Sequence, residues 1–186
     1  PMGYEYDLIN DFAKSQGLKL NIKVAENPAR LIEMLEAGEV DVVAYPIPIN
    51  NKLKQEVIYC GREDISSQVL IQRANKGDKL LTDVTQLIDK NVYVKPNTKY
   101  SERLKNLDEE LGGGIHIQKV ENDSIATEDL IEMVSLGEIP YTISDDNTAR
   151  LNKTYYWNIN VDLKVSFPQR SSWVVRKSSP DLAKAI

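Results

Sequence analysis

The amino-acid sequence predicts an α/β protein of two similarly built lobes, each a mostly parallel sheet flanked by helices. Segments with helical spacing of apolar residues alternate with short strand-like segments along the chain, a pattern typical of β-α-β units. A helix-to-strand junction at 31–40 recurs in similar form at 130–139. The chain has 186 residues, of which 41% are hydrophobic, so it can bury one sizeable core or two small ones.

The first elements are predicted from apolar spacing and from residues that begin or end helices. Residues 4–16 carry apolar side chains one helical turn apart, which predicts a helix. Residues 18–24 alternate apolar and polar side chains, which predicts a half-buried strand. Asn27 and Pro28 are typical of a helix start, with Asn27 as the N-cap, and a short apolar strand is expected at 40–44.

The rest of the chain continues this alternation. Helices are predicted where apolar residues recur three and four positions apart, at 84–88, 99–111, 127–136, 145–151 and from Ser179 onwards. Strands are predicted in the short apolar or alternating segments between them, at 68–72, 92–94, 115–120, 141–144, 159–165 and 173–175.

The repeated junction is the strongest indication of two lobes. Residues 31–40 read LIEMLEAGEV and residues 130–139 read LIEMVSLGEI. In both copies an amphipathic helix ends at a glycine, Gly38 or Gly137, and an acidic residue and a short apolar strand follow. Coincidence is the alternative, because such junctions are common in α/β proteins. The length of the match favours two lobes of similar build.

The composition excludes several classes of function. The net charge of −5 disfavours a nucleic-acid partner, which would need a basic face, and no apolar run is long enough for a transmembrane segment. Cys60 is the only cysteine, so no intramolecular disulfide forms, and we expect it to be buried. His116 is the only histidine and lies in an alternating segment, so we expect it to face solvent. We therefore expect no catalytic residue, no metal and no cofactor in this chain.

Several segments, taken in order, resemble the family 3 extracellular solute-binding proteins. Residues 3–13 (GYEYDLINDFA) resemble the first helix of that family, and residues 35–43 (LEAGEVDVV) resemble its helix-to-strand turn. Residues 141–145 (YTISD) are similar to the corresponding turn of the second lobe, and residues 173–182 to the closing strand and helix. The resemblance spans nearly the whole chain and implies a two-lobed periplasmic binding protein-like type II fold.

The resemblance also implies where the lobes begin and end. Lobe 1 is expected at 1–66 plus 167–186 and lobe 2 at 67–166, with hinge strands near 66–70 and 164–167. Such lobes close on a small molecule because the ligand contacts both of them in the closed state. The first strand of lobe 1 would precede Gly3 and is missing, so we expect the sequence to be a piece of a longer protein.

Within the family, the sequence most resembles the regulatory domain of the membrane-bound lytic murein transglycosylase F proteins. The segments that carry this likeness are 3–6, 67–68 and 141–145. It implies a non-catalytic periplasmic domain that responds to peptidoglycan fragments and is linked to a C-terminal transglycosylase domain, with outer-membrane association through segments outside the sequence. The Glu-Ser dipeptide that carries the general acid in those enzymes is absent, so glycan cleavage is expected outside residues 1–186. The alternatives are a stand-alone solute-binding protein of an ABC transporter for an amino acid or small organic acid, and an enzyme built on this fold.

Ligand contacts are predicted at the strand ends of the second lobe. Asn97, Thr98 and Tyr100 lie between a predicted strand and the following helix, where ligands bind in open α/β sheets. Plain N-capping by Thr98 is equally compatible with the sequence. The resemblance implies that Asp145 holds a ligand ammonium group, with capping of the next helix as the alternative. Ser67, near the crossing between the lobes, is a further candidate.

In the first lobe, ligand contacts are predicted at Tyr45, Asn50 and Asn51. Members of the family usually carry Thr-x-x-Arg in this loop, and the arginine binds the ligand's carboxylate through two hydrogen bonds. In this sequence Asn50 stands at the position of the threonine and Leu53 at that of the arginine. A standard free amino acid is therefore disfavoured, and either a different ligand or a lost ligand site is favoured. The expected partner is a small molecule such as a muropeptide, an amino acid or a similar compound.

Overall fold

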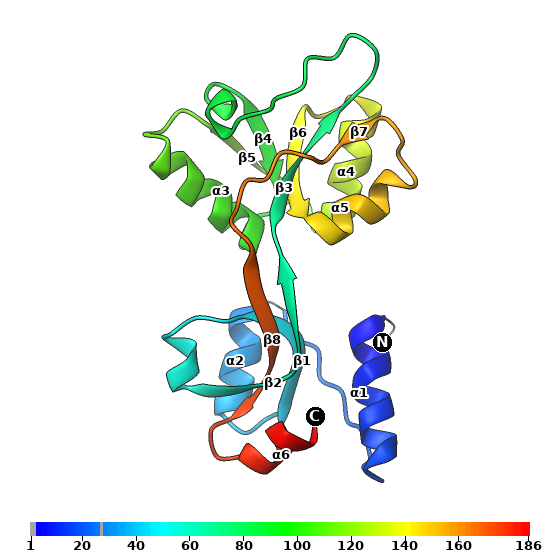
Figure 1. Ribbon diagram of the computed structural model, residues 1–186, viewed down its shortest axis with the longest axis vertical. Helices are drawn as coiled ribbons and strands as arrows, with labels where there is room; N and C mark the ends of the chain where they lie inside the picture. The colour runs from blue at the N-terminus through cyan, green and yellow to red at the C-terminus, as the bar shows by residue number, and fades with distance from the viewer. Residues whose placement is uncertain (1–2, 27) are drawn as a thin grey trace. The chain divides into compact units, whose positions relative to one another are not determined.

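The computed structural model describes residues 3–26 and 28–186, which form two compact units (Figure 1). Unit 1 comprises Pro1–Ile65 and Gln169–Ile186, and unit 2 comprises Ser66–Pro168. Lobe 1 was expected at 1–66 plus 167–186 and lobe 2 at 67–166. The predicted N-cap Asn27 lies outside the described residues.

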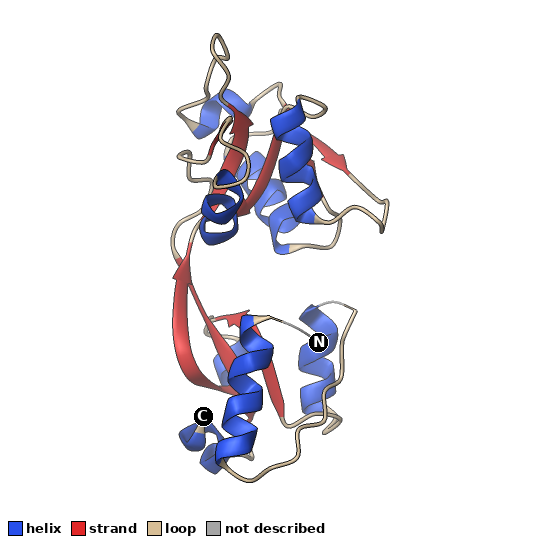
Figure 2. Cartoon of the chain, turned by 90° about the vertical axis from the view of Figure 1, so that its right-hand side faces the viewer, coloured by secondary structure: helices blue, strands red, loops and turns tan. Residues whose placement is uncertain are grey.

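Unit 1 is a small sheet with helices on both faces (Figure 2). Its strands have the order β1-β8-β2, and β1 runs antiparallel to β8. Its elements are α1 (Tyr4–Ser15), α2 (Pro28–Glu36), β1 (Val42–Pro48), the 3-10 helix η1 (Leu53–Gln55), β2 (Val57–Ser66), β8 (Gln169–Arg176) and α6 (Pro180–Ala185).

The two faces of the unit 1 sheet carry separate apolar clusters. Leu35 of α2 packs with Val43 and Val174 on one face. Ile9 of α1 packs with Trp173 on the other face, which α6 also covers. Because neighbouring residues of a strand point to opposite faces, α2 lies on one side of the sheet and α1 on the other.

Unit 2 contains a mixed sheet of strand order β5-β4-β6-β3-β7 with an apolar core on each face. Strands β5, β4 and β6 are parallel, whereas β3 is antiparallel to β6 and β7. Its elements are β3 (Gln68–Arg73), the 3-10 helix η2 (Val84–Leu87), β4 (Asn91–Val94), α3 (Lys99–Glu110), β5 (His116–Lys119), α4 (Thr127–Leu136), β6 (Tyr141–Asp145), α5 (Asp146–Lys153) and β7 (Ile159–Asn160).

The repeated junction has the same local structure in both units. Gly38 and Gly137 both adopt left-handed conformations, with φ of 74° and 80°. The N–H of the residue after each glycine donates to a methionine carbonyl, that of Met34 or Met133, at 2.9 Å in both copies. A left-handed residue closes a helix in this way, and glycine adopts it without steric cost. The two lobes therefore share this helix-to-strand junction, as the sequence indicated.

The strand directions differ in part from the expected, mostly parallel, arrangement. In unit 2, β5, β4 and β6 are parallel and β3 runs antiparallel to β6, whereas in unit 1 β1 runs antiparallel to β8. Residues 57–66 form β2, which the sequence did not indicate, because half of this strand is exposed and polar. The predicted strand at 18–24 does not form among the described residues, and that at 159–165 is reduced to β7 and an isolated bridge at Lys164.

Cys60 is buried and His116 is exposed, as predicted. No described helix is long and apolar enough to cross a membrane.

Cys60 is 6% exposed, and burial raises the pKa of its thiol from 9.0 to about 11. At pH 8 we expect the folded chain to react with a thiol reagent about 100-fold more slowly than the unfolded chain, which is the ratio of their thiolate fractions. The unfolded thiol ionises first, so stability should fall as the pH rises from about 9 through 11. Reaction rates measured with and without urea test this, and equal rates would contradict it.

Candidate functional site

The candidate site lies in unit 2, where two parallel strands end. β4 and β6 are parallel neighbours, so their carboxyl ends lie at the same edge of the sheet. The chain enters α3 at Lys99 after β4 and enters α5 at Asp146 directly after β6. Helix N-termini and strand ends meet in this way at the ligand sites of open α/β sheets.

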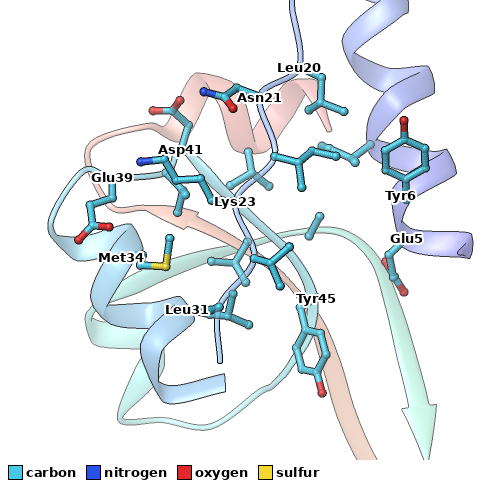
Figure 3. Close-up of a pocket in the computed structure, with 18 of the residues that line it drawn as sticks. Glu5, Tyr6, Leu20, Asn21, Lys23, Leu31, Met34, Glu39, Asp41 and Tyr45 are labelled. Atoms are coloured by element: carbon cyan, nitrogen blue, oxygen red, sulfur yellow. The ribbon is translucent and has the colours of Figure 1, made fainter. Parts of the chain in front are cut away.

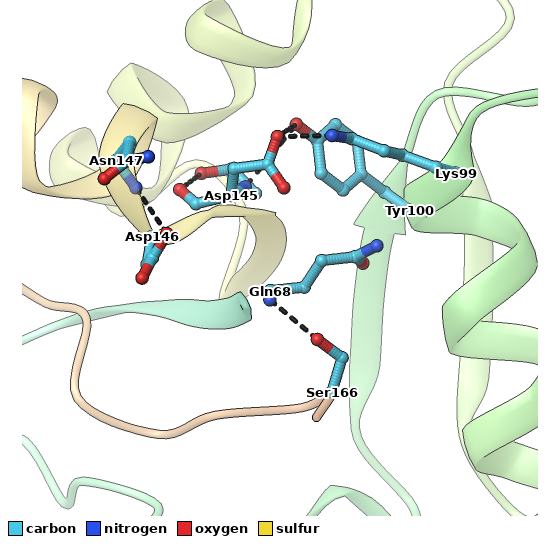
Figure 4. Close-up of polar contacts among 8 residues, drawn as sticks. Gln68, Lys99, Tyr100, Asp145, Asp146, Asn147 and Ser166 are labelled. Carbon is cyan, nitrogen blue, oxygen red and sulfur yellow. Dashed lines mark hydrogen bonds and ion pairs between the residues drawn. The ribbon is translucent and has the colours of Figure 1, made fainter. Parts of the chain in front are cut away.

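Three side chains meet at this edge (Figure 4). The Lys99 ammonium Nζ lies 2.5 Å from Oδ2 of Asp145. The Tyr100 hydroxyl donates to the same oxygen at 3.1 Å, and Lys99 Nζ lies 5.4 Å from the centre of the Tyr100 ring. Strand β6 and the first turn of α3 therefore contribute a carboxylate, a cation and a hydroxyl to one cluster.

The charges of this cluster form a partly exposed ion pair at the start of α3. A lysine in the first turn of a helix faces the positive end of the helix dipole, and Asp145 compensates this. The Asp145 side chain is 20% exposed and that of Lys99 43%. Ion pairs of this exposure add only about 0–1 kcal/mol to stability. A ligand ammonium can replace Lys99 at Asp145 at small cost, and the released Lys99 can bind an acidic group.

Gln68 lies next to this cluster and has an unpaired polar atom. Gln68 and Asp145 are partners across β3 and β6. The Gln68 side chain is buried, with the residue 3% exposed, and its Oε1 accepts no hydrogen bond from any described residue. Its backbone N–H donates to Ser166 Oγ at 2.8 Å (Figure 4). A buried acceptor without a donor costs about 1–3 kcal/mol in stability.

The other predicted contacts of unit 2 have local roles in the structure. Thr98 caps α3: its Oγ1 accepts from Ser101 N at 3.2 Å, and Ser101 Oγ accepts from Thr98 N at 3.1 Å. Asn97 is exposed and left-handed, with φ of 56°. Ser67 is buried, and its carbonyl accepts from Asp146 N at 2.9 Å. Thr98 and Ser67 thus hold the first turns of α3 and α5 in place, and their contact with a ligand stays a prediction.

The predicted contacts of unit 1 lie in and after β1. Tyr45 is 40% exposed and lines a cavity of unit 1 (Figure 3). Asn50 Oδ1 accepts from Leu53 N at 2.8 Å and so fixes the turn into η1. Asn51 is exposed. Their role in ligand binding also stays a prediction.

Sequence reasoning missed two members of the cluster, Lys99 and Gln68. Lys99 had a usable signal, because a lysine at the start of a helix needs an anionic partner to offset the dipole. The signal at Gln68 was weaker: a glutamine in an otherwise apolar strand buries a polar amide, which needs hydrogen-bond partners. The structure adds both to Tyr100 and Asp145, which the sequence had singled out.

Comparisons with known proteins agree with this architecture. Residues 1–186 match the family described as bacterial extracellular solute-binding proteins, family 3. The chain is 32% identical over 190 residues to a membrane-bound lytic murein transglycosylase F of Desulfosudis oleivorans, covering 100% of this chain and 40% of the relative. A protein of the same name from Pseudomonas fluorescens is 27% identical, with 93% and 35% covered. The chain thus spans about two fifths or less of the length of these relatives.

Solved structures share the fold. The truncated, arginine-bound ArgBP of T. maritima has a TM-score of 0.74 at 22% identity, covering 99% of this chain and 82% of that one. An ancestral arginine-binding protein bound to glutamine has a TM-score of 0.72 at 19% identity, with 99% and 78% covered. YCKB_BACSU from Bacillus subtilis has a TM-score of 0.76 at 22% identity, with 99% and 70% covered. At these identities the likeness establishes the type II fold of periplasmic amino-acid-binding proteins.

Proposed function

Because the chain belongs to the bacterial extracellular solute-binding proteins, family 3, we propose that it binds a small solute at a site that includes Gln68, Lys99, Tyr100 and Asp145. The buried, unpaired Oε1 of Gln68 carries this proposal. An acceptor of this kind is satisfied when a donor from outside the chain reaches it. Its neighbour across the strand pair is Asp145, whose carboxylate already accepts from a cation and a hydroxyl.

The chemistry of the cluster defines the class of ligand. Gln68 Oε1 and the Asp145 carboxylate both require a donor, which an ammonium or amide group supplies. Lys99, once displaced from Asp145, requires an acidic group. Amino acids and short peptides carry both groups. We favour a peptide-bearing peptidoglycan fragment, because Leu53 stands where free amino acid binders of this family carry arginine.

The proposed context is a longer, extracytoplasmic protein. The relatives named membrane-bound lytic murein transglycosylase F are more than twice as long as the chain, which covers 40% or less of them. In this proposal the domain lies in the periplasm, does not cleave glycan itself, and regulates a linked transglycosylase domain according to ligand occupancy. The second candidate function is solute capture for a transporter, which the likeness to arginine-binding proteins over 99% of the chain favours.

A ligand screen tests the proposal. Thermal unfolding of the full-length protein is measured with single amino acids and with purified muropeptides. A ligand at 100 times its Kd stabilises by about 2.7 kcal/mol, which raises the Tm by roughly 5–10 °C for a chain of this size. We expect this shift with muropeptides. A shift with amino acids alone would support the transporter function instead.

The variant Asp145→Asn links that shift to the candidate site. It removes the negative charge and keeps the shape of the side chain, so we expect the ligand-induced shift to fall by at least half. The matched control is Asp162→Asn, an exposed aspartate of the same unit that accepts a hydrogen bond from Asn160. An unchanged shift in Asp145→Asn, or an equal loss in the control, would place the ligand elsewhere.

A further inference from the structure

The segment from the end of α5 to β7 in unit 2 exposes several large apolar side chains (Figure 1). Leu151 is 59% exposed, Tyr155 73% and Trp157 81%. Single exposed apolar residues are common on protein surfaces, whereas a group of them marks an interaction site. We call Arg150, Leu151, Lys153, Tyr155 and Trp157 the α5 patch.

The residues on either side of Trp157 are fixed by the fold. Tyr156 packs against the core cluster of unit 2 that contains Ala149. Asn158 is held by Ser135 of α4: its Oδ1 accepts from Ser135 Oγ at 2.6 Å, and its Nδ2 donates to the Ser135 carbonyl at 2.9 Å. The exposure of Trp157 is therefore built into the fold between two anchored neighbours.

Leu151 and Tyr155 lie on the same outer side of the chain. The N–H groups of Tyr155 and Tyr156 both donate to the Asn152 carbonyl, at 3.0 and 2.9 Å, so a helical turn continues past the end of α5. Residues four positions apart are neighbours on a helical turn. The inner side of α5 is already packed through the buried Ala149, so these outer side chains have no core to join.

Two cations accompany the apolar residues. Arg150 and Lys153 are exposed and form no ion pair with a described residue. Residues 147–161 contain no acidic residue, although the whole chain has a net charge of −5. Cations in the last turn of a helix offset the negative end of its dipole. The dipole does not account for the exposed aromatic rings beside them, and the combination complements a surface that is both anionic and apolar.

We propose that the α5 patch binds the surface of a bilayer that contains anionic phospholipids. Tryptophan and tyrosine side chains prefer the level of the lipid headgroups, where the ring is in apolar surroundings and its N–H or O–H stays hydrated. Leu151 reaches the adjoining acyl chains, while Arg150 and Lys153 bind lipid phosphates. The contact is peripheral, and it uses a different part of unit 2 from the cluster around Asp145.

The charges of the patch disfavour two other occupants. A second copy related by a two-fold axis would place the same patch against itself, so that cations would face cations. A glycan strand is usually held by carboxylate and amide side chains that pair with its hydroxyl groups. The α5 patch contains neither a carboxylate nor an amide side chain.

Vesicle binding tests the proposal. The chain of residues 1–186 is sedimented with vesicles of phosphatidylcholine alone, and with vesicles in which about a third of the lipid is phosphatidylglycerol. We expect at least tenfold stronger binding to the anionic vesicles, weakening as salt is added. Tryptophan emission should shift to the blue on binding, because Trp157 is exposed and the other tryptophan, Trp173, is only 9% exposed. No binding to the anionic vesicles, or equal binding to both kinds, would overturn the proposal.

Removing the two cations of the patch measures the electrostatic part. Arg150→Gln combined with Lys153→Gln should weaken binding to the anionic vesicles about 25-fold, because each cation near such a surface contributes about fivefold. The matched control is Lys76→Gln combined with Lys79→Gln, which removes two exposed lysines of the same unit. An equal loss in the control would show that the net charge drives binding rather than the α5 patch.

Removing one aromatic ring measures the apolar part. Trp157→Ser should weaken vesicle binding at least fivefold, because the indole ring no longer enters the headgroup layer. Phe167→Ser is the matched control, at a single aromatic residue of the same unit that is 88% exposed. We expect the control to bind vesicles as the wild type does. Unchanged binding by Trp157→Ser would remove the aromatic residue from the contact and contradict the proposal.

The same Trp157→Ser variant distinguishes the other occupants. Sedimentation velocity without lipid and pull-down with lipid-free peptidoglycan sacculi are compared for the wild type and the variant. We expect no difference between the two proteins in either measurement. A dimer that the substitution dissociates would make a second copy the occupant of the patch, and sacculus binding that the substitution abolishes would make it a glycan. Either result would overturn the proposal of a lipid surface.

Discussion

Replacing Gln68 by methionine is expected to lower ligand affinity at least tenfold while leaving the unliganded protein as stable as the wild type or more stable. Methionine has a similar length and removes the buried Oε1 that has no donor among the described residues. Removing an unpaired buried acceptor relieves a desolvation cost of about 1–3 kcal/mol. The same change removes an acceptor that the proposed ligand uses, so stability and affinity should change in opposite directions.

Gln72→Met is the matched control, on the same strand and equally buried. Gln72 Nε2 donates to the Leu81 carbonyl at 2.9 Å, and Gln72 Oε1 accepts from Leu81 N at 2.8 Å. Methionine here leaves two buried backbone groups unpaired, at about 1–3 kcal/mol each. We expect Gln72→Met to lower the free energy of unfolding by roughly 2–6 kcal/mol and to leave the affinity of the folded fraction unchanged.

Urea unfolding and calorimetry measure both quantities, with the compound that gives the largest thermal shift in the wild type as the ligand. A Gln68→Met protein that is markedly less stable would mean that Gln68 has a structural partner and is no ligand contact. Unchanged affinity in the same variant would remove Gln68 from the site.

Leu130→Ala is expected to lower the free energy of unfolding by about 2–5 kcal/mol. Leu130 lies on α4, is fully buried, and packs with Val69 and Ile71 of β3 in the core of unit 2. The substitution removes buried apolar area and leaves a cavity that close-packed neighbours refill only in part. Because α4 packs on β3, which carries Gln68, the loss should also weaken the candidate site.

Leu136→Ala makes the same chemical change six positions along the same helix, where the side chain is 65% exposed. We expect a change within about 0.5 kcal/mol, as for other exposed positions. The two variants are compared by urea unfolding monitored by Trp fluorescence and circular dichroism. Equal losses would mean that α4 does not pack on β3 as described.

The sequence alone determined the features that depend on neighbours along the chain. The amphipathic helices, the glycines at 38 and 137 and the similar junctions that they end follow from local spacing and from the left-handed conformation that glycine adopts. The two-lobed α/β class follows from the order of these local elements. Tyr100 was predicted as a ligand contact from its place after a strand, and Asp145 from the family resemblance. The structure brings these two side chains together.

Only the tertiary structure decided what depends on residues far apart in the chain. Strand β8 pairs with β1 from more than 120 residues away, and this pairing makes the unit 1 sheet antiparallel there. Residues 18–24 alternate as a strand should, yet pairing requires a neighbour that the described residues do not supply. The contact of Lys99 with Asp145 and the unpaired oxygen of Gln68 arise where β3, β6 and α3 meet. Local spacing selects an element, but the hydrogen-bond partners of a strand edge or a buried side chain come from the whole fold.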